Sequence, residues 1–272
     1  MSPGLEARDG AAAELLAPLR AQPGNAAILT DLDGTLAPIV QRPEEAEVPA
    51  AASELLQELS VRFGMVGCIS GRPAEEARRL VGVEGIAYAG NHGLELLAPG
   101  DDAPRLDPSL AGREAGAAEF VAGLDGDALA QVGLRLEDKG PIQALHWRGV
   151  NDERAAEARA RKVAAEAGRA GLEPRWGRKV LEVRPVGGGG KDAAVAALLA
   201  SNGVSSAIYA GDDRTDLDAF HRLRQLREQG ELDTAICVGV VSAEGPAELP
   251  EESDLTVEGP GGWLAMLESL AS

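Results

Sequence analysis

Residues 26–35 read AAILTDLDGT, a short apolar run that ends in two aspartates with one residue between them. The apolar run is typical of a buried strand, and Gly34 permits a sharp turn directly after it. Alternate residues of a strand point to the same side, but a turn beginning at Leu32 would separate Asp31 from Asp33. Ligands of open α/β sheets bind beyond the carboxyl ends of the strands. Two carboxylates there can hold a hard cation and supply a nucleophile and an acid/base, whereas the simpler alternative is a solvated acidic loop.

The chain on both sides of this motif alternates between strand and helix patterns. Strands are expected at Ala26–Thr30, Met65–Ile69, Ile86–Ala89, Ala207–Ala210, Ala235–Val240 and Leu255–Val257. Helices are expected at Ala50–Val61, from Pro73 onward, and at Lys191–Ala200, Thr215–Glu228 and Gly262–Leu270. Strands separated by helices favour a parallel sheet with right-handed crossovers. We therefore predict an α/β fold whose core, residues 1–97 and 187–272, is a Rossmann-like parallel sheet.

Residues 98–186 break this alternation and predict an inserted α+β domain. The break starts with a linker-like run at Pro99–Pro104. The elements expected after it are a helix over Ser109–Leu124, strands over Val132–Glu137 and Ile142–Arg148, a helix from an N-cap at Asn151 to Gly168, and strands over Leu172–Trp176 and Lys179–Arg184. The turn Asp138-Lys139-Gly140-Pro141 between the first two strands indicates a hairpin.

The strands of this insertion alternate between apolar and charged residues. Leu145 and Trp147, for example, alternate with His146 and Arg148. Because successive strand residues point to opposite faces, the apolar face is expected to pack against the two helices. The opposite face, charged with both signs, is either an ordinary solvated surface or, in an insertion within an enzyme-like core, a lid over a polar ligand.

The chain is acidic and has the composition of a globular protein. It has 272 residues, 44% of them hydrophobic, and a formal net charge of -18. That hydrophobic content is enough to form a core. A protein this acidic is not expected to bind nucleic acid or an anionic membrane surface. An anionic substrate would therefore need a local cluster of lysine, arginine or bound metal.

The sequence carries no pattern typical of membrane insertion or export. No segment approaches the ~18 consecutive apolar residues that a membrane span needs. The N-terminus lacks a basic start followed by an apolar centre. Cys68 and Cys237 lie inside apolar runs, which predicts buried free thiols in place of a disulfide. We expect a soluble, cytoplasmic, monomeric protein.

Three further groups of polar residues lie just beyond expected strands. Ser70-Gly71-Arg72 follows one strand, Lys191 begins a helix after the glycine run Gly187–Gly190, and Gly211–Asp216 reads GDDRTD. Three carboxylates within five positions repel one another unless a cation or a lysine compensates them. The glycine run does not match a nucleotide-phosphate loop, because Lys191 is followed by Asp192 and not by serine or threonine.

The order of aspartate pair, serine, lysine and acidic cluster resembles the haloacid dehalogenase superfamily of phosphotransferases, and the insertion resembles the cap domain of some members. A finer resemblance is to the trehalose-6-phosphate phosphatase family, through Asp31–Leu36 (DLDGTL), Ser70–Pro73 (SGRP), Gly90–Gly93 (GNHG), Glu137–Gly140 (EDKG), His146–Arg148 (HWR), Glu182–Pro185 (EVRP) and Gly211–Phe220 (GDDRTDLDAF). Two positions depart from that family's pattern. Leu217 replaces a glutamate, and Asp192 replaces the glycine that follows the lysine.

The resemblance implies a magnesium-dependent phosphatase. Asp31 would be the nucleophile and would form an aspartyl-phosphate. Asp33 would protonate the leaving oxygen and then deprotonate the attacking water. Mg²⁺ would be held by Asp31, the main-chain carbonyl of Asp33, and Asp212, which suits a hard cation that prefers oxygen ligands.

Other residues would support the phosphoryl group and the sugar. Thr35, Ser70 and Lys191 would hold the phosphoryl oxygens. Asp213 and Asp216 would orient Lys191 and metal-bound water. The residues expected to bind the sugar phosphate are Arg72, Asn91, His92, Lys139, Arg148, Lys179 and Glu182.

The expected reaction is hydrolysis of trehalose 6-phosphate to trehalose and phosphate. A phosphatase of the same design could act on another sugar phosphate, of the sucrose-phosphate or glucosyl-phosphoglycerate type. A phosphosugar mutase also uses an aspartate nucleophile but returns the phosphoryl group to the sugar. A non-catalytic sugar-phosphate sensor is disfavoured, because a sensor has no need to keep the acid/base Asp33.

Overall fold

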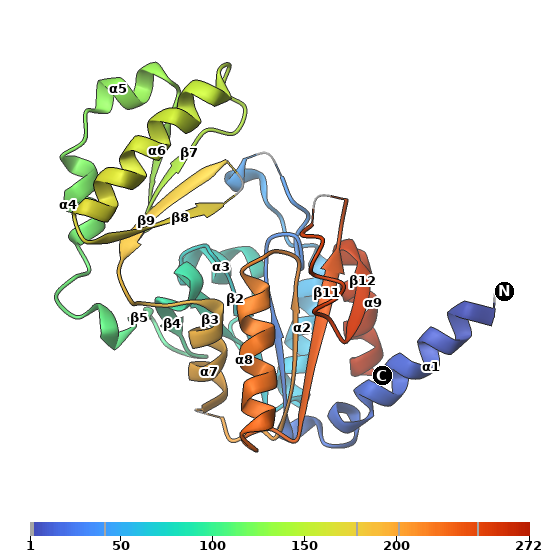
Figure 1. Cartoon of the computed structure of the whole chain (residues 1–272). Coiled ribbons are helices and arrows are strands. Elements are labelled where there is room, and N and C mark those ends of the chain that lie inside the picture. The colour runs from blue at the N-terminus through green and yellow to red at the C-terminus, as the bar shows by residue number, and fades with distance from the viewer. Residues whose placement is uncertain (1–2, 41, 178, 201, 244) are drawn as a thin grey trace. The chain divides into compact units, whose positions relative to one another are not determined.

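The chain folds into two compact units. The computed structural model describes residues 3–40, 42–177, 179–200, 202–243 and 245–272. One unit, here called the core unit, comprises Met1–Arg105 and Gly189–Ser272, and the other, the inserted unit, comprises Leu106–Gly188 (Figure 1). None of the helices among these residues is both long and apolar enough to cross a bilayer.

The core unit is built on a mostly parallel sheet with the order β12-β11-β10-β1-β2-β3-β4-β5. Its strands are β1 (Ala26–Thr30), β2 (Met65–Ile69), β3 (Ala87–Gly90), β4 (Glu95–Leu97), β5 (Arg105–Leu106), β10 (Ser206–Gly211), β11 (Thr234–Val241) and β12 (Leu255–Glu258). β1 is central and pairs in parallel with β10 and β2, so that Thr30 lies opposite Ala210 and Cys68. The predicted α/β fold is confirmed, and the strand that ends in the two aspartates lies in the middle of the sheet.

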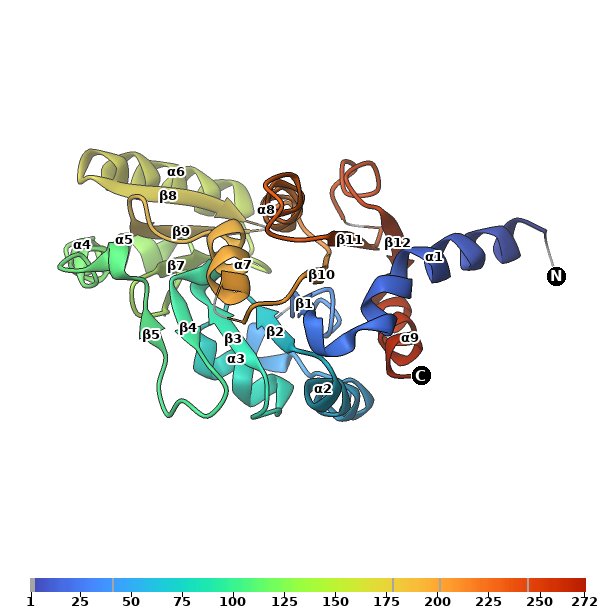
Figure 2. The same ribbon diagram turned by 90° about the horizontal axis from the view of Figure 1, so that it is seen from below.

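Helices cover both faces of this sheet (Figure 2). They are α1 (Pro3–Ala21), α2 (Ala50–Arg62), α3 (Ala74–Val81) and α9 (Gly259–Ala271) on one face, and α7 (Lys191–Ala200) and α8 (Asp216–Glu228) on the other. Residues of β1 alternate between the two cores, with Ile28 packed in the first and Leu29 in the second. Because both faces are buried, the strand is apolar from Ala26 to Leu29 and ends at the buried Thr30.

The inserted unit is an antiparallel sheet with helices on its apolar face. The sheet order is β6-β7-β9-β8. Its elements are α4 (Gly116–Ala122), α5 (Gly126–Gln131), β6 (Arg135–Asp138), β7 (Gln143–His146), α6 (Glu153–Arg169), β8 (Leu172–Gly177) and β9 (Val180–Pro185). β6 and β7 form the predicted hairpin. Leu145, Trp147 and Leu181 pack against alanines and Val163 of α6, as the alternating pattern predicted.

The helix predicted over Ser109–Leu124 is present only in its C-terminal half, and its predicted start is wrong. The structure has a short 3-10 turn over Pro108–Leu110 and then α4, with Gly112 between them in the left-handed region at φ 74°. α5 occupies the following residues, because the carboxylate of Asp125 accepts a hydrogen bond from the main-chain nitrogen of Ala128 and caps its first turn. The next strand therefore begins later than expected.

Three smaller features also correct or confirm the sequence interpretation. The N-cap of α6 is Asp152, which accepts a 2.9 Å hydrogen bond from the nitrogen of Ala155, and not Asn151. Leu134 and Leu136 alternate with charged residues, which predicts that both pack in the core; Leu134 is buried, but Leu136, on the edge strand β6, is 51% exposed. Cys68 and Cys237 are buried free thiols, as predicted.

Candidate active site

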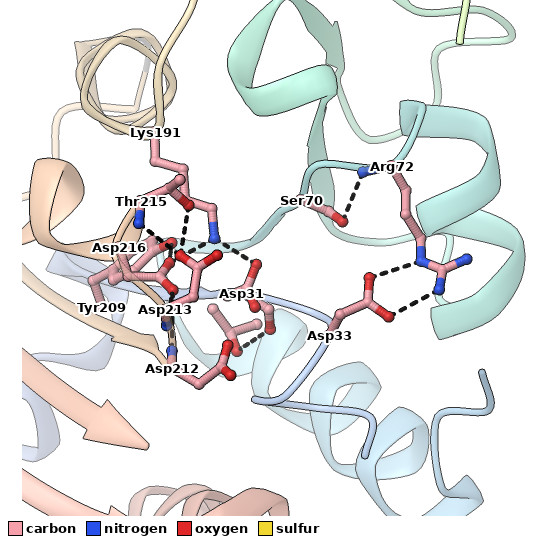
Figure 3. A network of polar contacts seen from close by, with 11 residues as sticks. Asp31, Asp33, Ser70, Arg72, Lys191, Tyr209, Asp212, Asp213, Thr215 and Asp216 are labelled. Atoms are coloured by element: carbon pink, nitrogen blue, oxygen red, sulfur yellow. Dashed lines mark hydrogen bonds and ion pairs between the residues drawn. The ribbon is translucent and has the colours of Figure 1, made fainter. Parts of the chain in front are cut away.

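The turn after β1 brings its two aspartates, Asp31 and Asp33, into contact with different cations. The main-chain nitrogen of Asp31 donates to the carbonyl of Ala210 at 2.8 Å, so Asp31 continues the parallel pairing with β10. Gly34 then adopts φ 93°, and a Cβ atom there would lie 2.2 Å from a carboxylate oxygen of Asp212. Only glycine meets both conditions. The turn thus directs Asp31 toward Lys191 and Asp33 toward Arg72 (Figure 3).

The ammonium of Lys191 lies between two buried carboxylates. Its Nζ donates to Oδ1 of Asp31 and to Oδ1 of Asp216, both at 2.7 Å. All three side chains are nearly or fully excluded from water, with exposed side-chain fractions of 3%, 6% and 0% for Lys191, Asp31 and Asp216. A buried charge is tolerated when it is paired and hydrogen-bonded. A buried cation is therefore present at this edge of the sheet, although the two carboxylates paired with it leave the cluster without net positive charge.

Asp216 is held by four donors. Besides Lys191, the hydroxyl of Tyr209 donates to Oδ1 at 2.5 Å, and the main-chain nitrogens of Asp212 and Asp213 donate to Oδ2 at 3.0 and 2.9 Å. Gly211 allows this approach, because a Cβ atom there would lie 2.1 Å from Cγ of Asp216. Asp216 thus organises the acidic loop and also binds Lys191.

Asp213 has a different set of partners in the same loop. Its Oδ1 accepts hydrogen bonds from the nitrogen and the hydroxyl of Thr215, each at 2.7 Å. Burial opposes ionisation of this carboxyl, but the positive charge of Lys191 and the Thr215 hydrogen bonds lower its pKa below the ordinary value. Asp213 is therefore a carboxylate that is kept in place beside Lys191.

The carboxylates of Asp31, Asp212 and Asp216 could hold a metal ion. One oxygen of each lies within 4.8 Å of the others, and all three residues are buried. An all-oxygen donor set of this kind fits a hard divalent cation such as Mg²⁺. Both oxygens of Asp216 already accept hydrogen bonds, so Asp31 and Asp212 are the carboxylates better suited to direct coordination.

Burial dominates the titration of Asp31. It raises the pKa of the Asp31 carboxyl well above its ordinary value, and the opposing attraction of Lys191 only partly offsets this effect. Burial would lower the pKa of Lys191, but the charges of Asp216 and Asp31 raise it well above the ordinary value. Lys191 is therefore a permanent cation, and a further positive charge near Asp31 would favour its ionised, nucleophilic form.

Arg72 holds Asp33 in a bidentate ion pair. Its Nε donates to Oδ2 and its Nη2 to Oδ1 of Asp33, at 2.7 and 2.9 Å, and its Nη1 donates to Glu76. Burial alone would lower the pKa of Arg72, but the hydrogen bonds and charges of these two carboxylates keep it above its ordinary value. In this structure Arg72, which was expected to bind substrate, sets the position of Asp33.

Two hydroxyls expected to bind phosphate lie at the same sheet edge. Thr35 and Ser70 are buried, with exposed fractions of 0% and 1%. Ser70 Oγ accepts a 3.1 Å hydrogen bond from the nitrogen of Arg72 and so shapes the turn after β2. Among the residues that the structure describes, the hydroxyl oxygen of Thr35 has no hydrogen-bond partner. A buried polar atom of this kind is suited to a ligand oxygen.

The loop after β3 is strained and anchored by a residue that the sequence did not indicate. Asn91 and His92 both have positive φ, 50° and 55°. The amide of Asn91 donates to Oε1 of Glu95 at 2.8 Å, and the other oxygen of Glu95 accepts from the nitrogen of Ala74 at the start of α3. Asn91 is fully buried. Left-handed non-glycine residues persist where the surroundings fix them, often at functional sites.

Of the four residues of the inserted unit expected to bind sugar, the structure joins two directly. Lys139 Nζ and Glu182 Oε1 form a 2.9 Å ion pair across the sheet. Lys179 precedes β9 with φ 60° and pairs with Glu153 at the start of α6. Arg148 follows β7 and is partly buried.

Most of the chain matches the sequence model of one known protein family. The sequence model described as Trehalose-phosphatase matches residues 29–253. The chain is 35% identical over 216 residues to a trehalose-phosphate phosphatase of Mycobacterium avium, covering 75% of this chain and 53% of that protein. It is also 37% identical over 208 residues to an uncharacterized glycosyl hydrolase of Mycobacterium tuberculosis, covering 73% of this chain and 15% of that protein. The chain thus spans about half or less of the length of these two relatives.

A solved structure shows the same fold. The C-terminal domain of trehalose-6-phosphate phosphatase from C. albicans superposes with a TM-score of 0.76 at 22% sequence identity. The match covers 95% of this chain and 96% of that domain, so it includes both the core unit and the inserted unit.

Proposed function

The chain belongs to the trehalose-phosphatase family, and on that premise we propose that it hydrolyses trehalose 6-phosphate to trehalose and inorganic phosphate. The observation that carries the proposal is the buried Asp31–Lys191–Asp216 cluster at the end of the central strand, with Asp33 beside it. This arrangement places a nucleophile, a fixed cation and an acid/base at the end of the central strand, although the cation comes from a distant part of the chain.

Asp31 attacks the phosphorus atom in the first step. An oxygen–phosphorus bond forms to its carboxylate while the bond from phosphorus to the sugar oxygen breaks, leaving an aspartyl-phosphate. Asp33 donates a proton to the departing sugar oxygen, and trehalose leaves. In the second step Asp33 takes a proton from water, the water oxygen bonds to phosphorus, and Asp31 is released with inorganic phosphate.

Hydrogen-bond donors of the core unit would stabilise the negative charge of the transferred phosphoryl group. Lys191 offers its ammonium, and Thr35 and Ser70 offer hydroxyls, to the phosphoryl oxygens. A divalent cation held by Asp31, Asp212 and the main-chain carbonyl of Asp33 would reduce the repulsion between the nucleophile and the phosphate. We propose Mg²⁺, because the available donors are all oxygens.

The inserted unit is proposed as the cap that recognises the sugar. In this assignment the core unit is the hydrolase core and the inserted unit, Leu106–Gly188, is the cap, close to the bounds of 98–186 expected from the sequence. The Lys139–Glu182 pair presents a donor beside an acceptor, which suits the hydroxyl groups of a disaccharide. Within the inserted unit, Arg148 and Lys179 are further residues proposed to bind the sugar; within the core unit, Asn91 and His92 are proposed to bind the sugar phosphate.

The mechanism is tested by two substitutions and a control. Asp31→Asn should lower kcat by on the order of 10³-fold or more, because an amide is a poor nucleophile. Asp33→Asn should slow turnover and allow phosphate to remain on Asp31, detectable by mass spectrometry of the peptide after rapid acid quench. Asp218→Asn, on the exposed side of α8, should leave activity unchanged. Substantial turnover by Asp31→Asn would contradict the mechanism.

Product analysis separates the hydrolase from its rivals. A phosphatase releases inorganic phosphate in proportion to free sugar, whereas a phosphosugar mutase yields an isomeric sugar phosphate and little free phosphate. A preference for sucrose phosphate or glucosyl phosphoglycerate would keep the chemistry of Asp31 and change the assigned substrate.

A further inference from the structure

Tyr209 is a neutral side chain whose hydroxyl contacts the buried Asp31–Lys191–Asp216 cluster. It lies on β10 opposite Leu29 of β1 and Cys237 of β11, and it is fully buried. Its hydroxyl donates to Oδ1 of Asp216 at 2.5 Å. Burial and the neighbouring charge of Asp216 raise the pKa of the Tyr209 phenol well above its ordinary value, so the group stays protonated at neutral pH and acts as a donor.

The ring of Tyr209 is fixed by packing, which fixes its hydroxyl as well. It meets the ring of Phe220 edge to face, with centroids 5.9 Å apart and an interplanar angle of 79°. Phe220 lies on α8, the helix that begins at Asp216. The same helix therefore carries both the carboxylate and the ring against which the tyrosine packs.

Oδ1 of Asp216 is shared between this hydroxyl and the ammonium of Lys191. Lys191 in turn divides its donors between Asp216 and Asp31, with equal distances of 2.7 Å. A second donor on Oδ1 neutralises part of the charge that would otherwise draw Lys191 toward Asp216. The balance between the two carboxylates thus depends on the tyrosine hydroxyl.

We propose that Tyr209 is a positioning residue for the phosphatase reaction, which holds Asp216 so that Lys191 stays centred and directs its charge to the phosphoryl group at Asp31. The proposal deepens the proposed function and rests on it for its kinetic consequence. Its structural part, the coupling of the Tyr209 hydroxyl to the Lys191 ammonium, does not depend on which substrate is hydrolysed.

The chain offers a matched control. It contains only two tyrosines. Tyr88 is also buried, at 1% exposure, and its hydroxyl donates to the main-chain carbonyl of Val83 at 2.6 Å. Tyr209→Phe and Tyr88→Phe therefore remove the same hydroxyl from similarly buried rings, but only the first removes a contact to the charged cluster.

The kinetic arm compares these two variants at saturating magnesium over a range of sugar phosphate concentrations, which gives kcat and KM separately. Tyr209→Phe should lower kcat about tenfold with KM changed by less than about twofold, the loss expected for one hydrogen bond to a charged group that matters in the transition state. Tyr88→Phe should keep both constants while losing comparable stability to urea. An unchanged kcat in Tyr209→Phe, or an equal fall in Tyr88→Phe, would overturn the proposal.

The spectroscopic arm uses the small number of lysines. The chain has four, Lys139, Lys162, Lys179 and Lys191, so ¹⁵N-lysine labelling gives a simple spectrum. Lys191 is the one buried between two carboxylates, and Lys191→Met assigns its ammonium signal. In the metal-free protein Tyr209→Phe should shift that signal and speed its hydrogen exchange, and Tyr88→Phe should leave it in place. A signal unmoved by Tyr209→Phe would contradict the coupling.

The two arms separate the two claims. If the wild-type chain releases no phosphate from any sugar phosphate, the proposed function fails, and the lysine spectrum still decides whether Tyr209 positions Lys191. If the wild-type chain is active and neither kcat nor the spectrum responds to Tyr209→Phe, the positioning role is wrong while the proposed function stands.

Discussion

At the residue scale, Asp31 and Asp33 carry the same carboxylate group but differ in their ion-pair partners and in their burial. Asp31 is buried against Lys191, whereas Asp33, one third exposed, is paired with Arg72. The sequence predicted that a turn at Leu32 would separate them, because alternate strand residues otherwise point the same way. It could not indicate the cation that each would contact, since Lys191 lies 160 residues from Asp31.

Arg72 provides a test of how Asp33 is held. Arg72→Gln removes the bidentate ion pair, so Asp33 becomes mobile and kcat for phosphate release should fall about tenfold. Arg72→Lys keeps the charge but not the planar pair of donors, and its kcat should be intermediate. Arg79→Gln, an exposed arginine of α3, should match wild type. Equal kcat in wild type and Arg72→Gln would show that the ion pair has no role in turnover.

At the element scale, the C-terminal helix supports the central strand. Nε1 of Trp263, on α9, donates to the hydroxyl of Thr30 at 3.0 Å, and that hydroxyl donates to the main-chain carbonyl of Asp31 at 2.8 Å. Both side chains are fully buried. α9 therefore contributes to the position of the β1 turn as well as to the core.

Replacing this tryptophan should cost stability. Trp263→Phe leaves the Thr30 hydroxyl without its donor and removes part of a buried ring, so the free energy of unfolding should fall by about 2 kcal/mol. Urea denaturation followed by circular dichroism measures the change. Trp176→Phe, at a tryptophan that is 45% exposed, should change stability by less than about 1 kcal/mol. Similar losses in both variants would remove the support for a specific Trp263–Thr30 contact.

The strands of the inserted unit make a pH-dependent contribution. Burial of Glu173 on β8 raises its pKa, but the hydrogen bond from Arg175 and the charge of Arg184 outweigh burial and lower it below the ordinary value of 4.5. A carboxyl with a lowered pKa stabilises the folded state at neutral pH, and this contribution disappears as pH falls below 4.5 through the folded-state pKa.

Glu173→Gln tests that contribution. At pH 7 the variant should be less stable to urea than wild type by about 1 kcal/mol, because Arg184 then lacks its carboxylate partner. The difference should shrink toward zero as the pH is lowered from about 5 to about 3. A difference that stays constant over this pH range would mean that the ion pairs of Glu173 do not stabilise the fold.

The elements of the core unit were more predictable than those of the inserted unit, for a physical reason. Strands buried on both faces, such as β1 and β2, are continuous apolar runs bounded by polar turns, and their predicted bounds match the structure. The helices α4 and α5 are short and begin at glycines, and capping by Asp125 decides where α5 begins, whereas α4 has no side-chain cap. Such local competition leaves little periodic signal in the sequence.

At the scale of the whole molecule, the sequence predicted which edge of the sheet carries the polar site residues, but it did not predict all the hydrogen bonds between them. Polar groups placed after separate strands converge because parallel strands end at one sheet edge, and this rule brought Asp31, Lys191 and Asp216 together. Neither Tyr209 nor Glu95 was predicted from the sequence. The residues next to them in the sequence do not indicate that Tyr209 donates a hydrogen bond to a buried carboxylate, or that the Glu95 carboxylate accepts one from the main chain. The net charge of -18 makes that local cation essential for an anionic substrate.

Phosphate release from a panel of sugar phosphates, with Mg²⁺ and after EDTA treatment, tests the central claim most directly. The account predicts rapid release of phosphate from trehalose 6-phosphate, slower release from other sugar phosphates, and loss of activity in EDTA that added Mg²⁺ restores. No release from trehalose 6-phosphate in the presence of Mg²⁺, or release that EDTA leaves unchanged, would contradict the role assigned to the Asp31 and Asp212 site.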